Sequence, residues 1–186
     1  MKEDVIKARE TLGNGGIILY PTDTIWGMGC DATDESAVNR IFGIKNRQDK
    51  RQMLILVAGY EDIADFVEDV PEIAIDFIIA ANRPLSIIFQ NAINLAPSLM
   101  GQDRTIGIRV VQDEFCKELI REFGKPIVST SANRSGTPSP DSFAHIDDRI
   151  KESVDYIVNW RQDDLTPASP SDIIKFGEDG EIIKIR

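Results

Sequence analysis

The amino-acid sequence predicts a protein of mixed α/β class, with helices and strands interspersed along the chain. Segments whose apolar residues recur at helical spacing alternate with short apolar runs typical of buried strands. The last two apolar runs flank Glu178-Asp179-Gly180, and Asp-Gly between such runs indicates an antiparallel hairpin. Interspersed elements that end in a hairpin favour a mixed sheet, in an α/β or α+β arrangement.

Local signals place each element in order. The first helix ends at the glycine-rich run 13–16, the second begins at the N-cap candidate Asp34, and another ends at Gly124. The expected helices span residues 2–12, 34–44, 60–67, 72–81, 114–123 and 143–151. The expected strands span residues 17–20, 53–58, 85–90, 105–110, 127–130, 156–158, 172–176 and 181–186.

Length and composition predict one domain over residues 1–186 of a cytoplasmic protein. A domain usually takes roughly 100–200 residues, and 42% of the 186 residues here are hydrophobic. No apolar run approaches the roughly 20 residues that cross a membrane, and the N-terminus lacks the apolar core of a signal peptide. The formal net charge of −10 argues against a protein that mainly grips phosphate backbones, although a local basic pocket can still bind a nucleotide.

Cysteine and histidine usage excludes several kinds of site. Cys30 and Cys116 lie far apart without a paired motif, and His145 is the single histidine. A disulfide scaffold or a zinc site is therefore not expected, and both thiols are interpreted as packing residues. Nothing near His145 indicates a Ser-His-Asp triad.

Three segments carry candidate binding residues. The first has four cations in seven residues, which is either a solvated charge run or a phosphate-binding segment. The second is the loop at 129–139, rich in hydroxyls, which is either an ordinary turn or an anion-binding loop. The third, at 20–29, places two Thr, one Asp and two Gly after a strand. The cations are Lys45, Arg47, Lys50 and Arg51.

The first two segments are expected to converge on one cleft, because both lie at strand ends and carry complementary anion-binding groups. Strand alternation over 105–110 places Thr105, Gly107 and Arg109 on one face, toward that cleft. The guanidinium of Arg109 suits a carboxylate, since its fork can donate two hydrogen bonds.

Several motifs in order resemble the YrdC-type threonylcarbamoyl-AMP synthase family, in its short, single-domain form. They are YPTDTIWGMGCDA, KNR, TIGIRV, GKPIVSTSANRSGTPSP and PSDII, and together they span most of the chain from about residue 12. The STSANRSGTPS segment is the most specific of them. The chain departs from the family pattern at Gln48 and Gln52, at 81–84, and at Asp172 after Ser171.

The resemblance implies a YrdC/RibB-like fold, an open twisted mixed sheet with flanking helices and a concave ligand face. It implies a nucleotidyltransferase that forms threonylcarbamoyl-AMP and diphosphate from L-threonine, bicarbonate and ATP, for tRNA threonylcarbamoyladenosine modification. Mg is expected with ATP and without metal ligands from the chain, because Mg keeps its waters. Partner proteins of tRNA modification and a weak tRNA or RNA contact are the further partners expected. The alternatives are a nucleotide- or RNA-binding protein of this fold without the activity, or a related carbamoyl- or acyl-transfer enzyme.

The resemblance also implies roles for individual residues. The catalytic signature maps onto Lys45, Arg47, Ser131 and Asn133. The ATP-binding group maps onto Lys45, Arg47, Arg51, Thr105, Ser131, Asn133, Ser139 and Arg186. The threonine-binding group maps onto Thr24, Arg109, Ser129 and Ser171.

Overall fold

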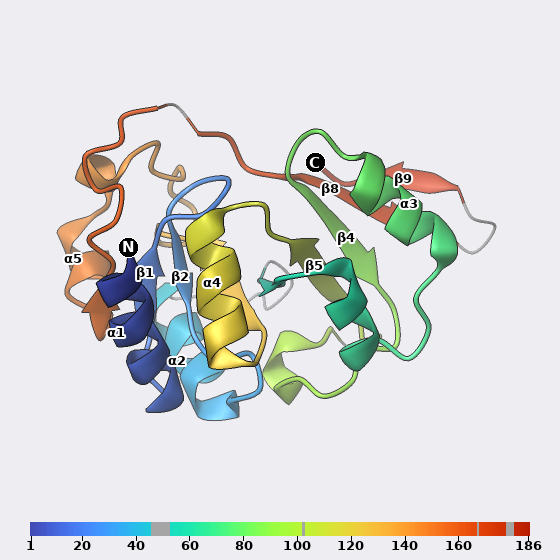
Figure 1. Ribbon diagram of the computed structural model, residues 1–186, viewed down its shortest axis with the longest axis horizontal. Coiled ribbons are helices and arrows are strands. Elements are labelled where there is room, and N and C mark those ends of the chain that lie inside the picture. Colours follow the sequence, from blue (N-terminus) through green and yellow to red (C-terminus); the bar gives the residue numbers. More distant parts are fainter. Residues whose placement is uncertain (46–52, 102, 167, 178–180) are drawn as a thin grey trace.

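A computed structural model describes residues 1–45, 53–101, 103–166, 168–177 and 181–186 (Figure 1). Nine strands in these ranges form one mixed sheet, in the order β7-β1-β2-β6-β3-β5-β4-β8-β9. The strands are β1 (Ile18–Tyr20), β2 (Gly27–Gly29), β3 (Leu54–Val57), β4 (Leu85–Phe89), β5 (Ile106–Val110), β6 (Ile127–Ser131), β7 (Tyr156–Ile157), β8 (Asp172–Phe176) and β9 (Ile182–Lys184). The mixed sheet with flanking helices confirms the predicted fold class.

Helices pack on both faces of the sheet. The α-helices are α1 (Lys2–Gly13), α2 (Glu35–Lys45), α3 (Glu72–Ala80), α4 (Glu114–Phe123) and α5 (Asp148–Lys151). The 3₁₀ helices are η1 (Tyr60–Asp65), η2 (Pro97–Leu99) and η3 (Phe143–His145). No helix in the described ranges is long and apolar enough to cross a membrane.

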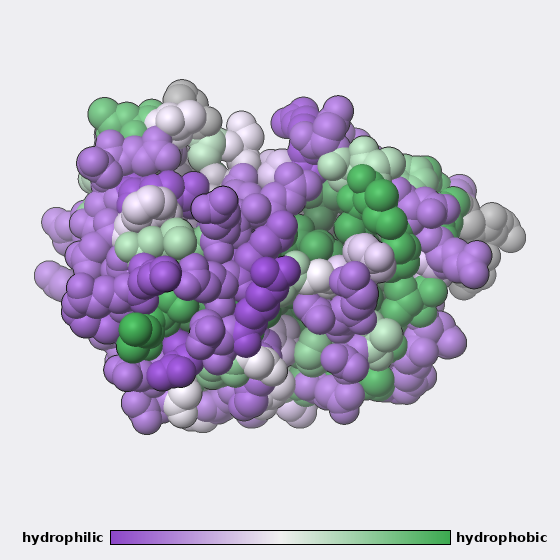
Figure 2. All heavy atoms as spheres, viewed as in Figure 1, coloured by the Kyte–Doolittle hydropathy of each residue, from purple (hydrophilic) through white to green (hydrophobic). Residues whose placement is uncertain are grey.

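Strand alternation divides the core into two layers. Leu19, Ile55 and Ile108 point to one face of the sheet, where they join α2, α3 and η1 in the larger hydrophobic cluster. Ile18 and Leu56 point to the other face, where α1 and α4 lie side by side over β1, β3 and β6. The two helices are buried on one side only, which explains the hydrophilic surface over them in Figure 2.

The second face is covered over half of its width. In register, Ile127 of β6 lies opposite Leu56 of β3, and Leu56 lies opposite Arg109 of β5. Arg109 in turn lies opposite Ser86 of β4. Directly opposed residues share a face, so this row runs from the hydrophobic core beneath α1 and α4 into an uncovered part of the sheet. The uncovered half is where a cavity lies.

Several elements differ from the sequence-based expectation. Residues 60–65 form a 3₁₀ helix instead of an α-helix, and the helix expected at 143–151 is split into η3 and α5. The strand β2 was not expected, since its sequence is Gly-Met-Gly and glycine is depleted in strands. Here glycine is required by space: a Cβ on Gly29 would lie 2.6 Å from the carbonyl oxygen of Val128 and 2.7 Å from the ring of Tyr20.

Two glycine substitutions test this packing. Gly29→Ala should lower the free energy of unfolding by about 1–3 kcal/mol, because backbone and a buried ring must move. Gly43→Ala should raise it by about 0.5–1 kcal/mol, because alanine is the better helix former and a Cβ there meets nothing within 4 Å. Urea unfolding of both variants measures the two effects. Equal effects of the same sign would contradict the close packing of β2.

Candidate functional site

A cavity of about 470 Å³ lies over the uncovered half of the sheet. Its floor is formed by residues of β3, β4, β5, β6 and β8, and residues 24–26 form one wall. Part of the segment between β7 and β8 borders it as well, and Figure 1 shows this segment running along the top of the view to β8. Eight of the residues to which the resemblance assigns a role line it: Thr24, Thr105, Arg109, Ser129, Ser131, Ser139, Ser171 and Arg186.

Arg109 is a buried charged residue of the cavity floor. Its side chain is 4% exposed, and its Nη2 lies 3.0 Å from Oδ1 of Asp23 in an ion pair that lacks straight hydrogen-bond geometry. The same Nη2 donates to the hydroxyl of Thr22 over 3.4 Å. The Nε of Arg109 is buried and has no hydrogen-bond partner. The guanidinium therefore has donor capacity left for an anion.

A pair of buried serines lies beside Arg109. The hydroxyls of Ser86 and Ser171 are 2.9 Å apart, and Ser86 lies directly opposite Arg109 in the sheet. Arg186 donates from Nε to the carbonyl oxygen of Ser171 over 3.1 Å. Burial, and then the positive charge of Arg109, lower the pKa of Arg186. Two guanidiniums and two hydroxyls thus gather at one end of the cavity, a donor set that suits a carboxylate.

The loop after β6 is organised around a buried lysine. The Nζ of Lys45, a residue 1% exposed, donates to the carbonyl oxygens of Ser131 at 2.6 Å and Asn133 at 2.8 Å. The hydroxyl of Ser131 donates to the side-chain oxygen of Asn133, whose amide donates to the carbonyl oxygen of Thr137. Lys45 and Asn133, expected to converge, therefore lie together behind Ser131, which faces the cavity.

Threonine hydroxyls and the carboxylate of Asp103 border the cavity elsewhere. The hydroxyl of Thr105 donates to Asp103 over 2.8 Å, which holds the pKa of that carboxyl below its usual value. The positive charge of Lys175 acts on Asp103 in the same direction. On the opposite wall, the hydroxyls of Thr24 and Thr22 are 2.9 Å apart, so Thr22 links Thr24 to Arg109.

The other sequence predictions have different outcomes. Arg47, Lys50 and Arg51 lie outside the described residues, so their expected roles stay predictions. The strand alternation of Thr105, Gly107 and Arg109 is confirmed, since all three line the cavity. Beyond the residues to which the resemblance assigns a role, the structure places Ser86 in the cavity floor and pairs Asp23, from the candidate segment at 20–29, with Arg109. Ser86 could have been found from its alternation within 85–90, whereas the partner of Asp23 depends on the tertiary fold.

The other nucleophile candidates lie apart from this cavity. Cys30 and Cys116 are buried free thiols, and burial raises the pKa of both well above the usual value. The Nδ1 of His145 contacts both Ser142 at 2.9 Å and Asp141 at 2.6 Å. A triad needs its serine and its carboxylate on opposite ring nitrogens, so this arrangement is not one.

Comparison with known proteins confirms the resemblance. The family model Sua5_yciO_yrdC, described as telomere recombination, matches residues 10–186. The threonylcarbamoyl-AMP synthase of Pseudoalteromonas translucida is 34% identical over 151 residues, which cover 80% of this chain and 81% of that protein. The protein of the same name from Hahella chejuensis is 36% identical over 128 residues, which cover 68% and 70%.

Solved structures share the fold. P. abyssi Sua5 complexed with L-threonine matches with a TM-score of 0.86 and 26% identity over 98% of this chain. The match covers 53% of P. abyssi Sua5, so this chain spans about half of that protein. E. coli YciO matches over 100% of this chain and 89% of its own, with a TM-score of 0.85 and 24% identity, and is similar in fold. With a family match from residue 10 to residue 186, the chain belongs to the Sua5/YciO/YrdC family.

Proposed function

We propose that the chain is an L-threonylcarbamoyladenylate synthase, which forms threonylcarbamoyl-AMP and diphosphate from L-threonine, bicarbonate and ATP. The observation that carries this proposal is the gathering of Thr24, Arg109, Ser129 and Ser171 around one cavity. Four of the nucleotide candidates line the same cavity, namely Thr105, Ser131, Ser139 and Arg186. Two findings support threonine as the substrate. The chain is similar to proteins named threonylcarbamoyl-AMP synthase, and its fold matches that of a Sua5 complexed with L-threonine.

The donor set suits threonine. Its carboxylate would pair with Arg109, whose Nε is unpartnered, and its hydroxyl would find acceptors among the neighbouring serine and threonine hydroxyls. The amine of threonine and bicarbonate would combine into a carbamate with loss of water. A carbamate oxygen would then attack the α-phosphorus of ATP, and diphosphate would leave. No covalent protein intermediate is needed, so catalysis would rest on positioning and charge stabilisation.

The nucleotide would occupy the side of the cavity nearer to Thr105, Ser131 and Ser139. Lys45 stabilises this side of the cavity, because its Nζ donates hydrogen bonds to the carbonyl oxygens of Ser131 and Asn133. Arg47 and Arg51 are proposed to meet the phosphates, as the family signature implies. The product would pass to partner proteins of tRNA modification, because the strongly acidic chain is poorly suited to grip RNA itself.

Product formation is the direct test. The protein is incubated with ATP, L-threonine and bicarbonate, and mass spectrometry identifies threonylcarbamoyl-AMP. Diphosphate release should depend on both threonine and bicarbonate. Binding of threonine or nucleotide without this product would instead indicate a binding protein of the same fold, and diphosphate release with another acceptor would indicate a related transfer enzyme.

Replacing Arg109 tests the threonine subsite. Arg109→Ala should weaken threonine binding at least about tenfold, because breaking a buried charge-assisted contact costs about 2–5 kcal/mol. ATP affinity should change by less than about threefold, since the nucleotide residues remain. Calorimetric titration of each ligand measures both affinities. Arg104→Ala is the matched control, because Arg104 precedes the same strand, pairs with Glu68 and is not among the cavity-lining residues. Unchanged threonine binding in Arg109→Ala would show that Arg109 serves another ligand.

Magnesium is proposed to enter with ATP. Mg²⁺ usually keeps several waters and is bound through substrate phosphates, so the ion would be carried mainly by ATP. Bound there, it would neutralise charge on the phosphates. Chelation of divalent ions with EDTA should suppress diphosphate release at least tenfold and leave calorimetric threonine binding without ATP unchanged. Full turnover in EDTA would refute the requirement.

A further inference from the structure

Arg161 lies in the segment between β7 and β8 in an unusual backbone conformation. Its φ of 62° falls in the left-handed region, where the Cβ of an L-residue crowds the backbone and glycine is usually found. Its Nε is buried without a hydrogen-bond partner. Both features cost free energy, so other contacts of this residue must hold it in place.

One nitrogen of Arg161 binds two other elements of the fold. Its Nη2 lies 2.9 Å from Oδ2 of Asp113 and donates to the carbonyl oxygen of Thr22 over 3.0 Å. Asp113 is the N-cap of α4, and its Oδ1 accepts the backbone N–H of Cys116 over 2.9 Å. Its side chain is 8% exposed, so the ion pair is shielded from water on the aspartate side. Arg161 therefore joins the loop at 21–26 to the start of α4.

Thr22 connects this loop to the proposed amino-acid subsite. Its hydroxyl lies 2.9 Å from the hydroxyl of Thr24 and accepts the backbone N–H of Thr24 over 3.0 Å. The same hydroxyl donates to the carbonyl oxygen of Ile25 over 2.9 Å and accepts from Nη2 of Arg109 over 3.4 Å. A shift of Thr22 would therefore displace the hydroxyl of Thr24 and remove a contact of Arg109.

Arg161 can act on a ligand of the large cavity only through this loop. Thr24, Ile25 and Trp26 line both the large cavity and a second cavity of about 340 Å³. Arg161 and Thr22 line the second cavity and not the first. The loop thus separates Arg161 from the large cavity.

We propose that Arg161 is a positioning residue for the amino-acid subsite, which holds Thr22 so that Thr24 and Arg109 keep the geometry that binds threonine. The proposal rests on the proposed function, because it assumes that this end of the large cavity binds the amino acid. The strained backbone of Arg161 is the local cost of directing its guanidinium to both Thr22 and Asp113.

Steady-state kinetics of diphosphate release separate this role from a merely structural one. Arg161→Gly removes the contacts and also relieves the left-handed strain. The KM for threonine should rise roughly fivefold or more, while kcat and the KM for ATP should change less than about twofold, because carboxylate contacts act equally before and during reaction at the amine. A variant that is only unstable has fewer active molecules, which lowers kcat and leaves both KM values unchanged. That second pattern would overturn the proposal.

Arg161→Ala separates the contacts from the strain. It loses the same hydrogen bonds as Arg161→Gly but keeps a Cβ at a left-handed φ. Its midpoint of urea unfolding should therefore be lower than that of Arg161→Gly, whereas the two KM values for threonine should agree within about twofold. A KM that followed stability from one variant to the other would contradict a positioning role.

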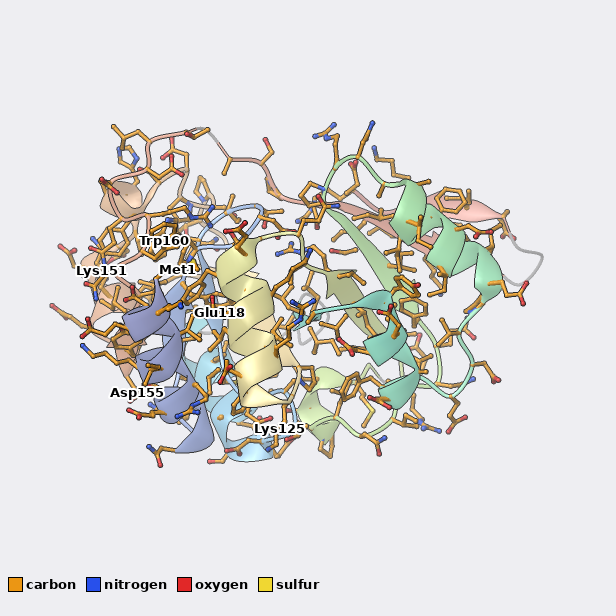
Figure 3. All side chains as sticks on the ribbon, in the orientation of Figure 1. Met1, Glu118, Lys125, Lys151, Asp155 and Trp160 are labelled. Carbon is orange, nitrogen blue, oxygen red and sulfur yellow. The ribbon has the colours of Figure 1, made fainter. Side chains whose placement is uncertain are left out.

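Arg40→Ala is the matched control. Arg40 also joins a backbone carbonyl and an aspartate, Gly15 at 3.2 Å and Asp155 at 2.9 Å, and it lines neither cavity. Figure 3 shows Asp155 near the C-terminal end of α1, whereas Trp160, the residue before Arg161, lies near the N-terminal end of that helix. Arg40→Ala should keep the KM for threonine within about twofold of the unaltered protein. An equal rise in both variants would overturn the proposal.

Asp113→Asn covers the case in which neither variant at position 161 folds. Asparagine is also a good N-cap residue, so α4 keeps its cap while Arg161 loses its charged partner. The KM for threonine should rise at least about twofold, because an amide holds the guanidinium more weakly than a carboxylate. In that case an unchanged KM would overturn the proposal. Absence of threonine-dependent diphosphate release from the unaltered protein would refute the proposed function instead, so the two failures are distinguishable.

Discussion

The site depends on one constraint, which is that α1 and α4 cover only half of one face of a broad sheet. The row of opposed residues Ile127, Leu56, Arg109 and Ser86 crosses the border between the covered and the open half. Its first two members belong to the hydrophobic core, whereas Arg109 and Ser86 form the cavity floor. The same strands thus contribute both to the hydrophobic core and to the cavity floor. The cavity is therefore built on the rigid sheet.

Two cations are nearly removed from solvent in this region, and each is stabilised differently. Lys45 is surrounded by carbonyl oxygens of the loop after β6, so its charge organises backbone and leaves the hydroxyl of Ser131 facing the cavity. Arg109 has a carboxylate partner and keeps its Nε donor unused. Desolvation makes an unpaired cation costly, so both arrangements are conditions for folding as well as for binding. Because these two cations are held by local contacts, a chain of net charge −10 can still contain anion-binding groups.

Much of this architecture could be predicted from the sequence, because periodicity reports which residues are buried. The alternation of Thr105, Gly107 and Arg109 toward the cavity follows from strand geometry alone. The strand β2 could not be predicted, because Gly29 is required by its close approach to Val128, which lies far away in sequence, as well as to the ring of Tyr20. The pairing of Asp23 with Arg109 joins residues 86 positions apart (109 − 23). The periodicity of a local segment cannot predict contacts between residues so far apart. A motif resemblance indicates which residues have a role, but not which side chains they contact.

The described residues favour catalysis by positioning over covalent catalysis. A nucleophile needs a base or a lowered pKa, and burial acts in the opposite direction on both cysteine thiols. Ser171 is hydrogen-bonded to Ser86 and faces arginines, which are donors and cannot accept its proton. His145 holds its serine and its aspartate on the same ring nitrogen. What remains is a cavity of hydroxyls and guanidiniums, which can orient a carboxylate beside a nucleotide and stabilise negative charge as it develops.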